Sequence, residues 1–202
     1  VASPDIHKKA REDRFQFHDH YLVDDLMDDD HRMARSAVRD WVKSEVSPII
    51  EDHFEQGTCP QHLYKGLAEI GAFGPSIPAE YGGGGMDEIA YGVIMQELER
   101  GDSGIRSMAS VQGSLVMYPI HAYGSDAQKE RWLPDMAAGR AIGCFGLTEP
   151  DFGSNPGGMR TRARREGDSW VLNGEKAWIT NGGIADVAVV WARTDEGIRG
   201  FL

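Results

Sequence analysis

Cysteine is scarce in this sequence: Cys59 and Cys144 are the only two, and they lie far apart. Such a pair forms no disulfide framework and is typical of a reducing compartment. Long apolar runs are also missing. No segment approaches the roughly 18 residues of a membrane-spanning helix, so we predict no membrane span. The net charge of -11 means that positive charge is in short supply. We therefore expect no nucleic-acid partner, because phosphate binding requires clustered Lys and Arg.

The N-terminal part offers little chemistry. His18, His20 and His31 fall in a polar segment, and a metal site needs more ligands than the sequence places near them, so we predict no metal. The first residues, 1–14, are polar and carry acids, which fits neither a signal peptide nor a mitochondrial presequence. We expect residues 1–21 to form a flexible extension.

The residues that follow, 22–139, carry the apolar spacing of helices. Pro48 is expected to kink or end the first helix. Ser125 and Gln128 have the spacing of a capping box, and Gly139 is a natural cap at the C-terminal end of the last helix. The expected helices cover residues 30–50, 63–70, 87–100, 105–120 and 125–138.

Residues 140–202 have the texture of strands instead. Asn173-Gly174 is a hairpin signal. The expected strands cover residues 141–147, 161–165, 169–172, 176–180 and 187–192. We therefore predict an α+β fold, with an all-α helical domain at 22–139 followed by a β-sheet domain at 140–202. The sequence stops at Leu202 in a strand-like run, so we expect this second domain to be incomplete.

A glycine-containing turn follows the first expected strand. The segment Phe145–Ser154 has the sequence FGLTEPDFGS, and its small residues let backbone N–H groups and hydroxyls approach a polar ring edge or a phosphate. It is not a dinucleotide motif of the Rossmann type, because no helix or acid follows at the needed spacing. Most such loops are simple turns, and that alternative stays open for this motif alone.

A second motif ends the expected strand at 176–180. Trp178 and Thr180 are two residues apart, which places both side chains on one face of a strand. An aromatic plane beside a hydroxyl can pack on a flat heteroaromatic cofactor and hydrogen-bond its edge. The alternative is a Trp that covers the sheet and a Thr chosen for its β-propensity.

Together the two motifs resemble the acyl-CoA dehydrogenase family. The resembling segments are LTEP at Leu147–Pro150 with the Gly153-Ser154 pair, NGEK at Asn173–Lys176, and WITN at Trp178–Asn181. The front of the chain resembles the same family at Ile77–Gly83 and at Tyr123–Pro134. The resemblance extends from about Leu22 to Leu202. It implies a barrel-like middle β-domain and a C-terminal helical bundle outside these residues.

The resemblance also implies an FAD site. Backbone groups from Phe145 to Thr148 would bind the pyrimidine edge of the flavin, with the Thr148 hydroxyl assisting. Trp178 would pack beside the isoalloxazine, Thr180 would face flavin N5, and Ser154 would approach the FAD pyrophosphate or the substrate. The implied cofactor-binding residues are Phe145, Gly146, Leu147, Thr148, Ser154, Trp178, Ile179 and Thr180. One departure is Asn155, where the family commonly has Asp.

Arg106 stands in an otherwise apolar expected helix, four residues before Ser110 and on the same face. A buried guanidinium needs an anionic partner, and a salt bridge to Glu97, Glu99 or Asp102 is the structural alternative. At this segment the sequence resembles the glutaryl-CoA dehydrogenase group. There an Arg-Ser pair and a following Ser hold the distal carboxylate of the substrate. The implied substrate-binding residues are Arg106, Ser107, Ser110 and Ser154.

The implied reaction is α,β-dehydrogenation of a short acyl-CoA. Glutaryl-CoA would be decarboxylated to crotonyl-CoA, with electrons passed to an electron-transfer flavoprotein. The implied base is a Glu of the C-terminal helical domain, so we assign no catalytic residue here. We expect a homotetramer in a bacterial cytoplasm, with the mitochondrial matrix as the alternative location. Two other functions stay open: a dehydrogenase for another short or branched acyl-CoA, and a non-enzymatic acyl-CoA- or flavin-binding homologue.

Overall fold

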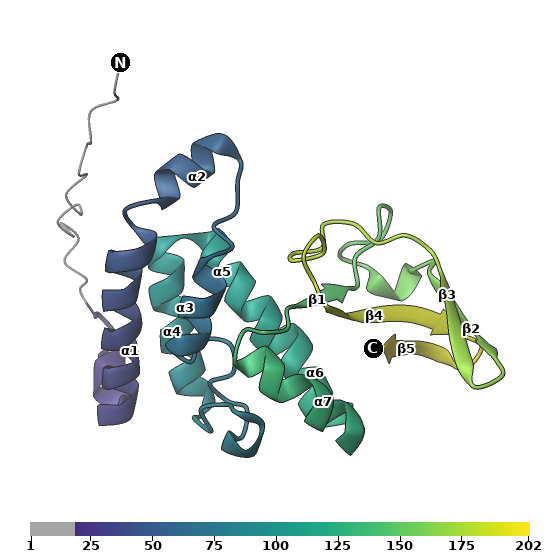
Figure 1. The fold of residues 1–202 in the computed structure, drawn as a ribbon, viewed down its shortest axis with the longest axis horizontal. Helices are drawn as coiled ribbons and strands as arrows, with labels where there is room; N and C mark the ends of the chain where they lie inside the picture. Colours follow the sequence, from purple (N-terminus) through teal and green to yellow (C-terminus); the bar gives the residue numbers. More distant parts are fainter. Residues whose placement is uncertain (1–18) are drawn as a thin grey trace.

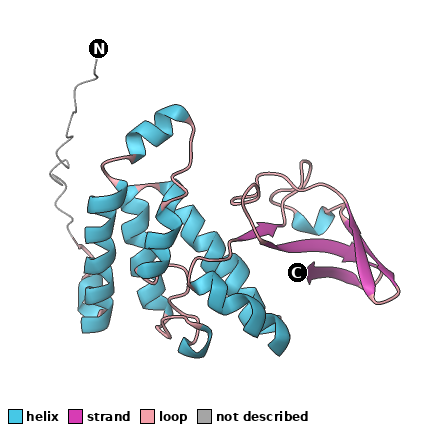
Figure 2. Cartoon of the chain, viewed as in Figure 1, coloured by secondary structure: helices cyan, strands magenta, loops and turns pink. Residues whose placement is uncertain are grey.

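The structure is a computed structural model that describes residues 19–202. The predicted extension at 1–21 lies mostly outside the described residues and stays a prediction. In the described part, a group of helices lies beside a small sheet, as Figures 1 and 2 show. The structure thus confirms a helical part followed by a sheet. Within residues 19–202, no helix is long and apolar enough to cross a membrane.

The helices begin where side chains can cap them. Asp28 accepts a hydrogen bond from the His31 N–H at the start of α1, and Ser125 and Gln128 form the predicted capping box of α7. Gly139 follows α7 with a φ of 68°, the left-handed conformation that favours glycine after a helix. The α-helices are α1 (Asp29–Trp41), α2 (Ile50–Gln56), α3 (Leu63–Glu69), α4 (Glu88–Gly101), α5 (Ser103–Ser110), α6 (Tyr118–Tyr123) and α7 (Asp126–Ala137).

Two π-helical segments widen the helical runs. One, Val42–Val46, extends α1, and the chain then turns at Pro48 before α2 begins, as the proline predicts. The other, Val111–Met117, joins α5 to α6 in one continuous run where the sequence predicts a single buried helix. Short 3-10 turns lie at Val23–Leu26, Ala79–Tyr81 and Pro156–Gly158.

The strands are β1 (Gly143–Gly146), β2 (Arg162–Glu166), β3 (Ser169–Asn173), β4 (Val187–Thr194) and β5 (Gly197–Phe201), and they form one five-stranded sheet. Strand β4 lies at its centre. It pairs in parallel with β1, starting at Gly143 opposite Val187, and antiparallel with β5. Strands β2 and β3 form a hairpin. Each of these strands overlaps or adjoins a run that the sequence marks as strand-like.

The predicted hairpin at Asn173-Gly174 and the strand at 176–180 are wrong. Strand β3 ends at Asn173, and no strand forms at 176–180. A type I′ turn needs positive φ near 60° at both central residues, whereas Gly174 has a φ of 157°. Glycine is required there by a close approach: a Cβ on Gly174 would lie 2.3 Å from Thr161 Oγ1.

The main core joins the helices to the sheet. Val187 and Val189 of β4 pack in the same buried cluster as Val116 and Met136. Gly143 allows this contact, because a Cβ there would lie 2.7 Å from Val116 Cγ1. Strand β1 therefore packs directly on the π-helical segment Val111–Met117, and the turn that follows β1 lies next to the helical part.

Candidate functional site

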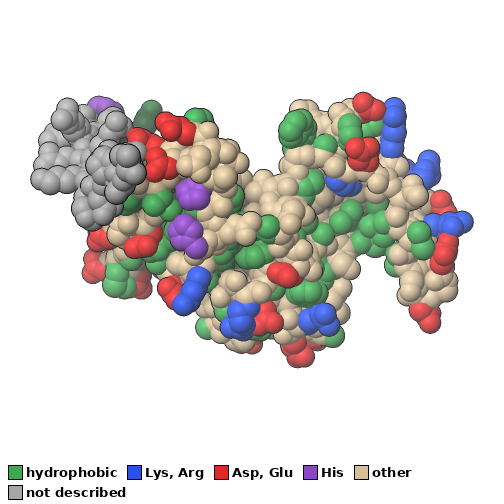
Figure 3. All heavy atoms as spheres, turned by 45° about the horizontal axis from the view of Figure 1, so that its top comes forward, with side chains coloured by type: hydrophobic (Ala, Val, Ile, Leu, Met, Phe, Trp, Pro, Cys, Tyr) green, Lys and Arg blue, Asp and Glu red, His purple; other side chains and the backbone are tan. Residues whose placement is uncertain are grey.

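A cavity of about 650 Å³ opens between the helices and the loop that precedes β4. Its size is within the range of small-molecule sites. The surface in Figure 3 is hollowed between the helical part and the sheet. Ser107 of α5, predicted to bind substrate, lines this cavity together with Ile179 and Thr180, predicted to bind cofactor. Other lining residues include Tyr64 of α3 and, from the segment between α2 and α3, Thr58, Cys59 and Gln61.

The loop that carries Thr180 has an unusual backbone. Trp178 has a φ of 59° and Asn181 a φ of 65°. A left-handed conformation is rare for a bulky residue and costs about 1–3 kcal/mol, and such strain clusters at ligand sites. Trp178 is 92% exposed. Because this segment is not a strand, the prediction that Trp178 and Thr180 share a strand face is wrong, but the aromatic face of Trp178 is free to pack on a ring.

Asn181 fastens this loop to the rest of the molecule. Its Oδ1 accepts a 2.7 Å hydrogen bond from the Tyr64 hydroxyl of α3, and its Nδ2 donates to the Gly143 carbonyl of β1 at 3.2 Å. Burial of the Tyr64 side chain raises its pKa, so the hydroxyl remains a donor. Sequence reasoning named Asn181 only as the last residue of the Trp178–Asn181 motif and gave neither Asn181 nor Tyr64 a role. The available signal was Asn181-Gly182, because Asn tolerates the left-handed region better than other residues that carry a side chain.

The Phe145–Thr148 turn lies beside the loop of Trp178. The Thr148 carbonyl accepts from the Ala177 N–H at 3.0 Å, and the Leu147 carbonyl accepts from Lys176 Nζ at 3.0 Å. The two motifs are therefore brought together. Phe145 packs edge-on against Trp191 of β4, with ring centroids 6.2 Å apart. None of the residues Phe145–Thr148 lines the 650 Å³ cavity.

Glu149 is a buried carboxylate that sequence reasoning left without a role. It is 5% exposed. Its oxygens accept from the N–H groups of Arg160 at 2.6 Å and Thr161 at 2.9 Å, and from Lys176 Nζ at 2.9 Å. Burial alone would raise the pKa of Glu149, but these N–H donors and the Lys176 ammonium lower it to about 2. Glu149 is therefore ionised at neutral pH.

Ser154 lies apart from the cavity. It is exposed in the loop between Glu149 and β2 and is not among the residues that line the 650 Å³ cavity. The neighbouring Asn155 precedes the 3-10 turn at Pro156–Gly158. The structure therefore does not bring Ser154 together with Ser107 and Thr180, and its predicted contact with cofactor or substrate stays a prediction.

Arg106 and Ser110 share a face of α5, as their spacing predicts. Arg106 Nη1 lies 3.3 Å from Ser110 Oγ. Arg106 Nε also donates to Glu99 Oε2 at 2.6 Å, so one of the alternative salt bridges is formed. Hydrogen bonds from Ser103 and Arg106 hold the pKa of Glu99 below its usual value. Arg106 and Ser110 do not line the 650 Å³ cavity, although their neighbour Ser107 does.

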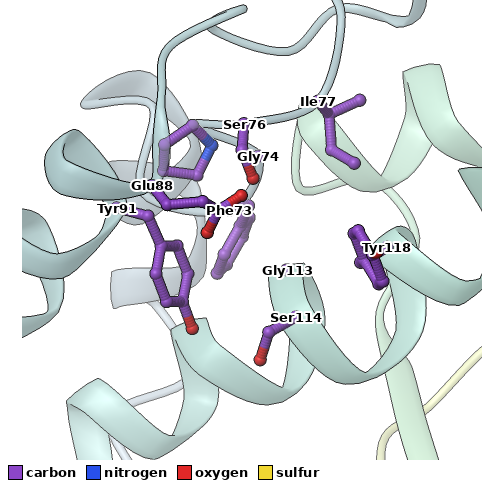
Figure 4. A pocket seen from close by; sticks show the side chains of 10 residues that line it. Phe73, Gly74, Ser76, Ile77, Glu88, Tyr91, Gly113, Ser114 and Tyr118 are labelled. Atoms are coloured by element: carbon purple, nitrogen blue, oxygen red, sulfur yellow. The ribbon is translucent and has the colours of Figure 1, made fainter.

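A second cavity, of about 350 Å³, lies on the helical part. Figure 4 shows side chains around it, with Tyr91 and Glu88 from α4 and Ser114 and Tyr118 from the run after α5. None of the predicted site residues lines it. The candidate site is therefore the larger cavity with the adjoining loops of Thr148 and Trp178.

Comparisons with known families match two successive parts of the chain. The model of the acyl-CoA dehydrogenase N-terminal domain matches residues 28–140, and that of the acyl-CoA dehydrogenase middle domain matches residues 144–202. Among curated proteins, the chain is 41% identical over 177 residues to the mitochondrial short-chain specific acyl-CoA dehydrogenase of Rattus norvegicus. That match covers 85% of the chain and 43% of the rat protein.

Solved structures give similar matches. A glutaryl-CoA dehydrogenase from Mycobacterium smegmatis in complex with FADH2 is 55% identical, with a TM-score of 0.87, over 90% of this chain and 47% of that one. Butyryl-CoA dehydrogenase from Megasphaera elsdenii is 31% identical, with a TM-score of 0.82, over 93% of this chain and 49% of that one. The chain thus spans about half the length of the proteins it matches.

Proposed function

The chain belongs to the acyl-CoA dehydrogenase family, and on that premise we propose that it binds FAD and serves in the α,β-dehydrogenation of a short acyl-CoA, with glutaryl-CoA as substrate and crotonyl-CoA as product. The observation that carries the proposal is the meeting of Ser107 with Ile179 and Thr180 at one cavity, beside the exposed Trp178. Two segments far apart in the sequence thereby supply one site.

The residues present fit a flavin. Trp178 offers an exposed ring face, and the Thr148 and Thr180 hydroxyls can hydrogen-bond a polar ring edge. In this proposal these residues, with the backbone of Phe145–Leu147, hold the cofactor, and Ser154 remains a candidate for its pyrophosphate. When bound, FAD accepts the hydride that leaves the β-carbon of the acyl group.

The α-proton needs a base, and three acids considered for this role, Glu97, Glu99 and Glu149, are already paired. Glu97 is 1% exposed and pairs with Arg39 at 2.6 Å. Glu149 is held by Lys176 and two N–H groups, and Glu99 is held by Arg106 and Ser103. A base should be free to take a proton near neutral pH, so we assign this role to none of the three.

The glutaryl specificity rests on Arg106. A planar guanidinium binds a carboxylate in two parallel hydrogen bonds, which Lys cannot match, and Ser110 lies 3.3 Å away to assist. The higher identity to glutaryl-CoA dehydrogenase, 55%, than to the short-chain enzyme, 41%, supports this substrate. We extend the proposal to transfer of electrons to an electron-transfer flavoprotein, a homotetramer and a bacterial cytoplasmic location.

A second substrate class is favoured by one contact. Arg106 Nε already donates to Glu99 at 2.6 Å. Fewer N–H groups of the guanidinium are therefore left for a substrate carboxylate. If that salt bridge persists, Arg106 is structural, and the site takes an uncharged short or branched acyl-CoA.

Anaerobic flavin bleaching tests these proposals. The full-length protein loaded with FAD is mixed with glutaryl-CoA or butyryl-CoA, and the loss of flavin absorbance and the release of crotonyl-CoA and CO2 are followed. We expect bleaching and CO2 release with glutaryl-CoA. Bleaching by butyryl-CoA alone supports the uncharged substrate class, and bleaching by neither acyl-CoA rejects the dehydrogenase proposal.

A further inference from the structure

The Glu149–Lys176 ion pair connects three segments that carry the predicted cofactor-binding residues. Glu149 directly follows Thr148. Lys176 lies two residues before Trp178 and four before Thr180. The N–H groups of Arg160 and Thr161, which also bind Glu149, close the loop that contains Ser154. One carboxylate therefore holds all three segments.

The connection continues along the main chain. Lys176 Nζ donates to the Leu147 carbonyl as well as to Glu149 Oε1, and the Ala177 N–H donates to the Thr148 carbonyl. Residues 174–180 belong to no strand, so no regular pairing fixes their distance from the Thr148 turn. The Lys176 side chain and the Ala177 N–H hold that distance along the segment, and the two hydrogen bonds of Asn181 fasten its far end.

A buried ion pair such as Glu149–Lys176 contributes little net stability to a protein. The side chains of Lys176 and Glu149 are only 12% and 4% exposed, and removing two charges from water offsets much of their attraction. Apolar residues of similar volume often stabilise a protein equally well at such places. The pair differs from an apolar contact in its geometry, because each donor and acceptor has a fixed direction.

We propose that Glu149 and Lys176 are positioning residues of the FAD site, whose ion pair sets the spacing between the Thr148 turn and the Trp178–Thr180 segment. The inference rests on the proposed function, because a positioned site matters only if a cofactor occupies it. Glu149 acts on the cofactor only indirectly, by positioning the adjacent Thr148 and, through Lys176, the Trp178–Thr180 segment.

Three variants of the full-length protein test the proposal. Lys176→Met keeps much of the aliphatic stem and removes the donors, while Lys176→Arg keeps a positive donor. Asp135→Asn is the matched control, because it breaks the exposed Asp135–Arg140 pair. We expect Lys176→Met to raise the FAD dissociation constant about tenfold or more and to shift the flavin reduction potential, since breaking a buried pair leaves a charge without its partner. Lys176→Arg should keep the FAD dissociation constant and the flavin reduction potential close to those of the native protein. Asp135→Asn should change neither quantity.

A measurement on the FAD-free protein separates this inference from the proposed function. Amide hydrogen exchange at residues 176–180 should be faster in Lys176→Met, with α7 unchanged. Unchanged exchange and FAD affinity in that variant would overturn the proposal, and so would faster exchange spread evenly over the whole sheet, which indicates a general loss of stability. If the native protein binds no FAD, the proposed function fails, while the exchange data still decide whether the pair fixes the two segments.

Discussion

The Tyr64 hydroxyl donates a 2.7 Å hydrogen bond to Asn181 Oδ1, across 117 positions of the sequence. Tyr64 belongs to α3, and Asn181 follows Thr180 in the loop before β4. This bond ties the helical part to the loop that brings Ile179 and Thr180 to the cavity. The placement of Thr180 therefore depends on a helix that sequence motifs do not connect with it.

Tyr64→Phe should remove this tie with almost no change of shape. We expect a loss of about 1–3 kcal/mol in unfolding free energy, because Asn181 Oδ1 loses its donor in a partly buried place. Urea denaturation measures the loss, and Tyr123→Phe is the control, since Tyr123 is 83% exposed. Equal effects in the two variants would contradict the role of this bond.

Arg106→Ala separates the two substrate classes. If Arg106 binds the distal carboxylate, kcat/KM should fall by about 2–4 kcal/mol in transition-state stabilisation with glutaryl-CoA and change little with butyryl-CoA. Arg140→Ala, in an exposed pair elsewhere, serves as the control. Equal losses on both substrates would show that the salt bridge to Glu99 is the main role of Arg106.

Gln112 supports the start of β1 from inside the core. It is 0% exposed. Its amide donates to the Met136 and Ala141 carbonyls, and its Oε1 accepts from the Gly143 N–H. Gln112→Leu leaves these buried groups without partners, and we expect a loss of about 3 kcal/mol or more in urea unfolding. Gln61→Leu, at an exposed position, should have little effect.

Acid should weaken the protein through Glu149. Its pKa falls from the ordinary 4.5 to about 2 on folding, so the folded state favours the ionised form. The stabilisation it gives is complete well above pH 4.5 and is lost as the pH falls towards 2. The difference in unfolding free energy between native protein and Glu149→Gln should therefore shrink between pH 5 and pH 3 in urea titrations. A difference that stays constant over that range would refute the assignment.

Two glycines should respond in opposite ways to alanine. Gly174→Ala places a Cβ 2.3 Å from Thr161 Oγ1, and the forced shift should cost about 1–3 kcal/mol. Gly92 lies exposed inside α4 with nothing within 4 Å of a Cβ, so Gly92→Ala should stabilise by up to about 1 kcal/mol. Thermal unfolding of both variants measures the contrast, and a stabilised Gly174→Ala would disprove the close approach.

Local signals predicted the helical part well because its ends are set by neighbouring residues. The Ser125–Gln128 capping box and the turn at Pro48 depend on contacts within a few positions. The loop of residues 174–184 could not be predicted in this way. Its course is decided by Thr161, Lys176 and Tyr64, whose partners lie far away in sequence.

The same distinction applies to the site. The spacing of Arg106 and Ser110 predicted their shared face, but it left several acids open as partners, and only the fold selects Glu99. The Asn173-Gly174 pair has the composition of a hairpin turn, yet close packing against Thr161 overrides it. The role of Glu149 could not be predicted from the sequence, because it depends on hydrogen-bond partners that are distant in sequence.

Trp178 gives the protein an optical reporter. The sequence has five tryptophans, and among the described residues Trp178, at 92%, is far more exposed than Trp170 at 44%. Its indole should emit at the long wavelengths of a water-exposed ring. A flat, absorbing molecule that settles against it should quench that emission. Binding of such a molecule could then be measured by tryptophan fluorescence, independently of any catalytic turnover.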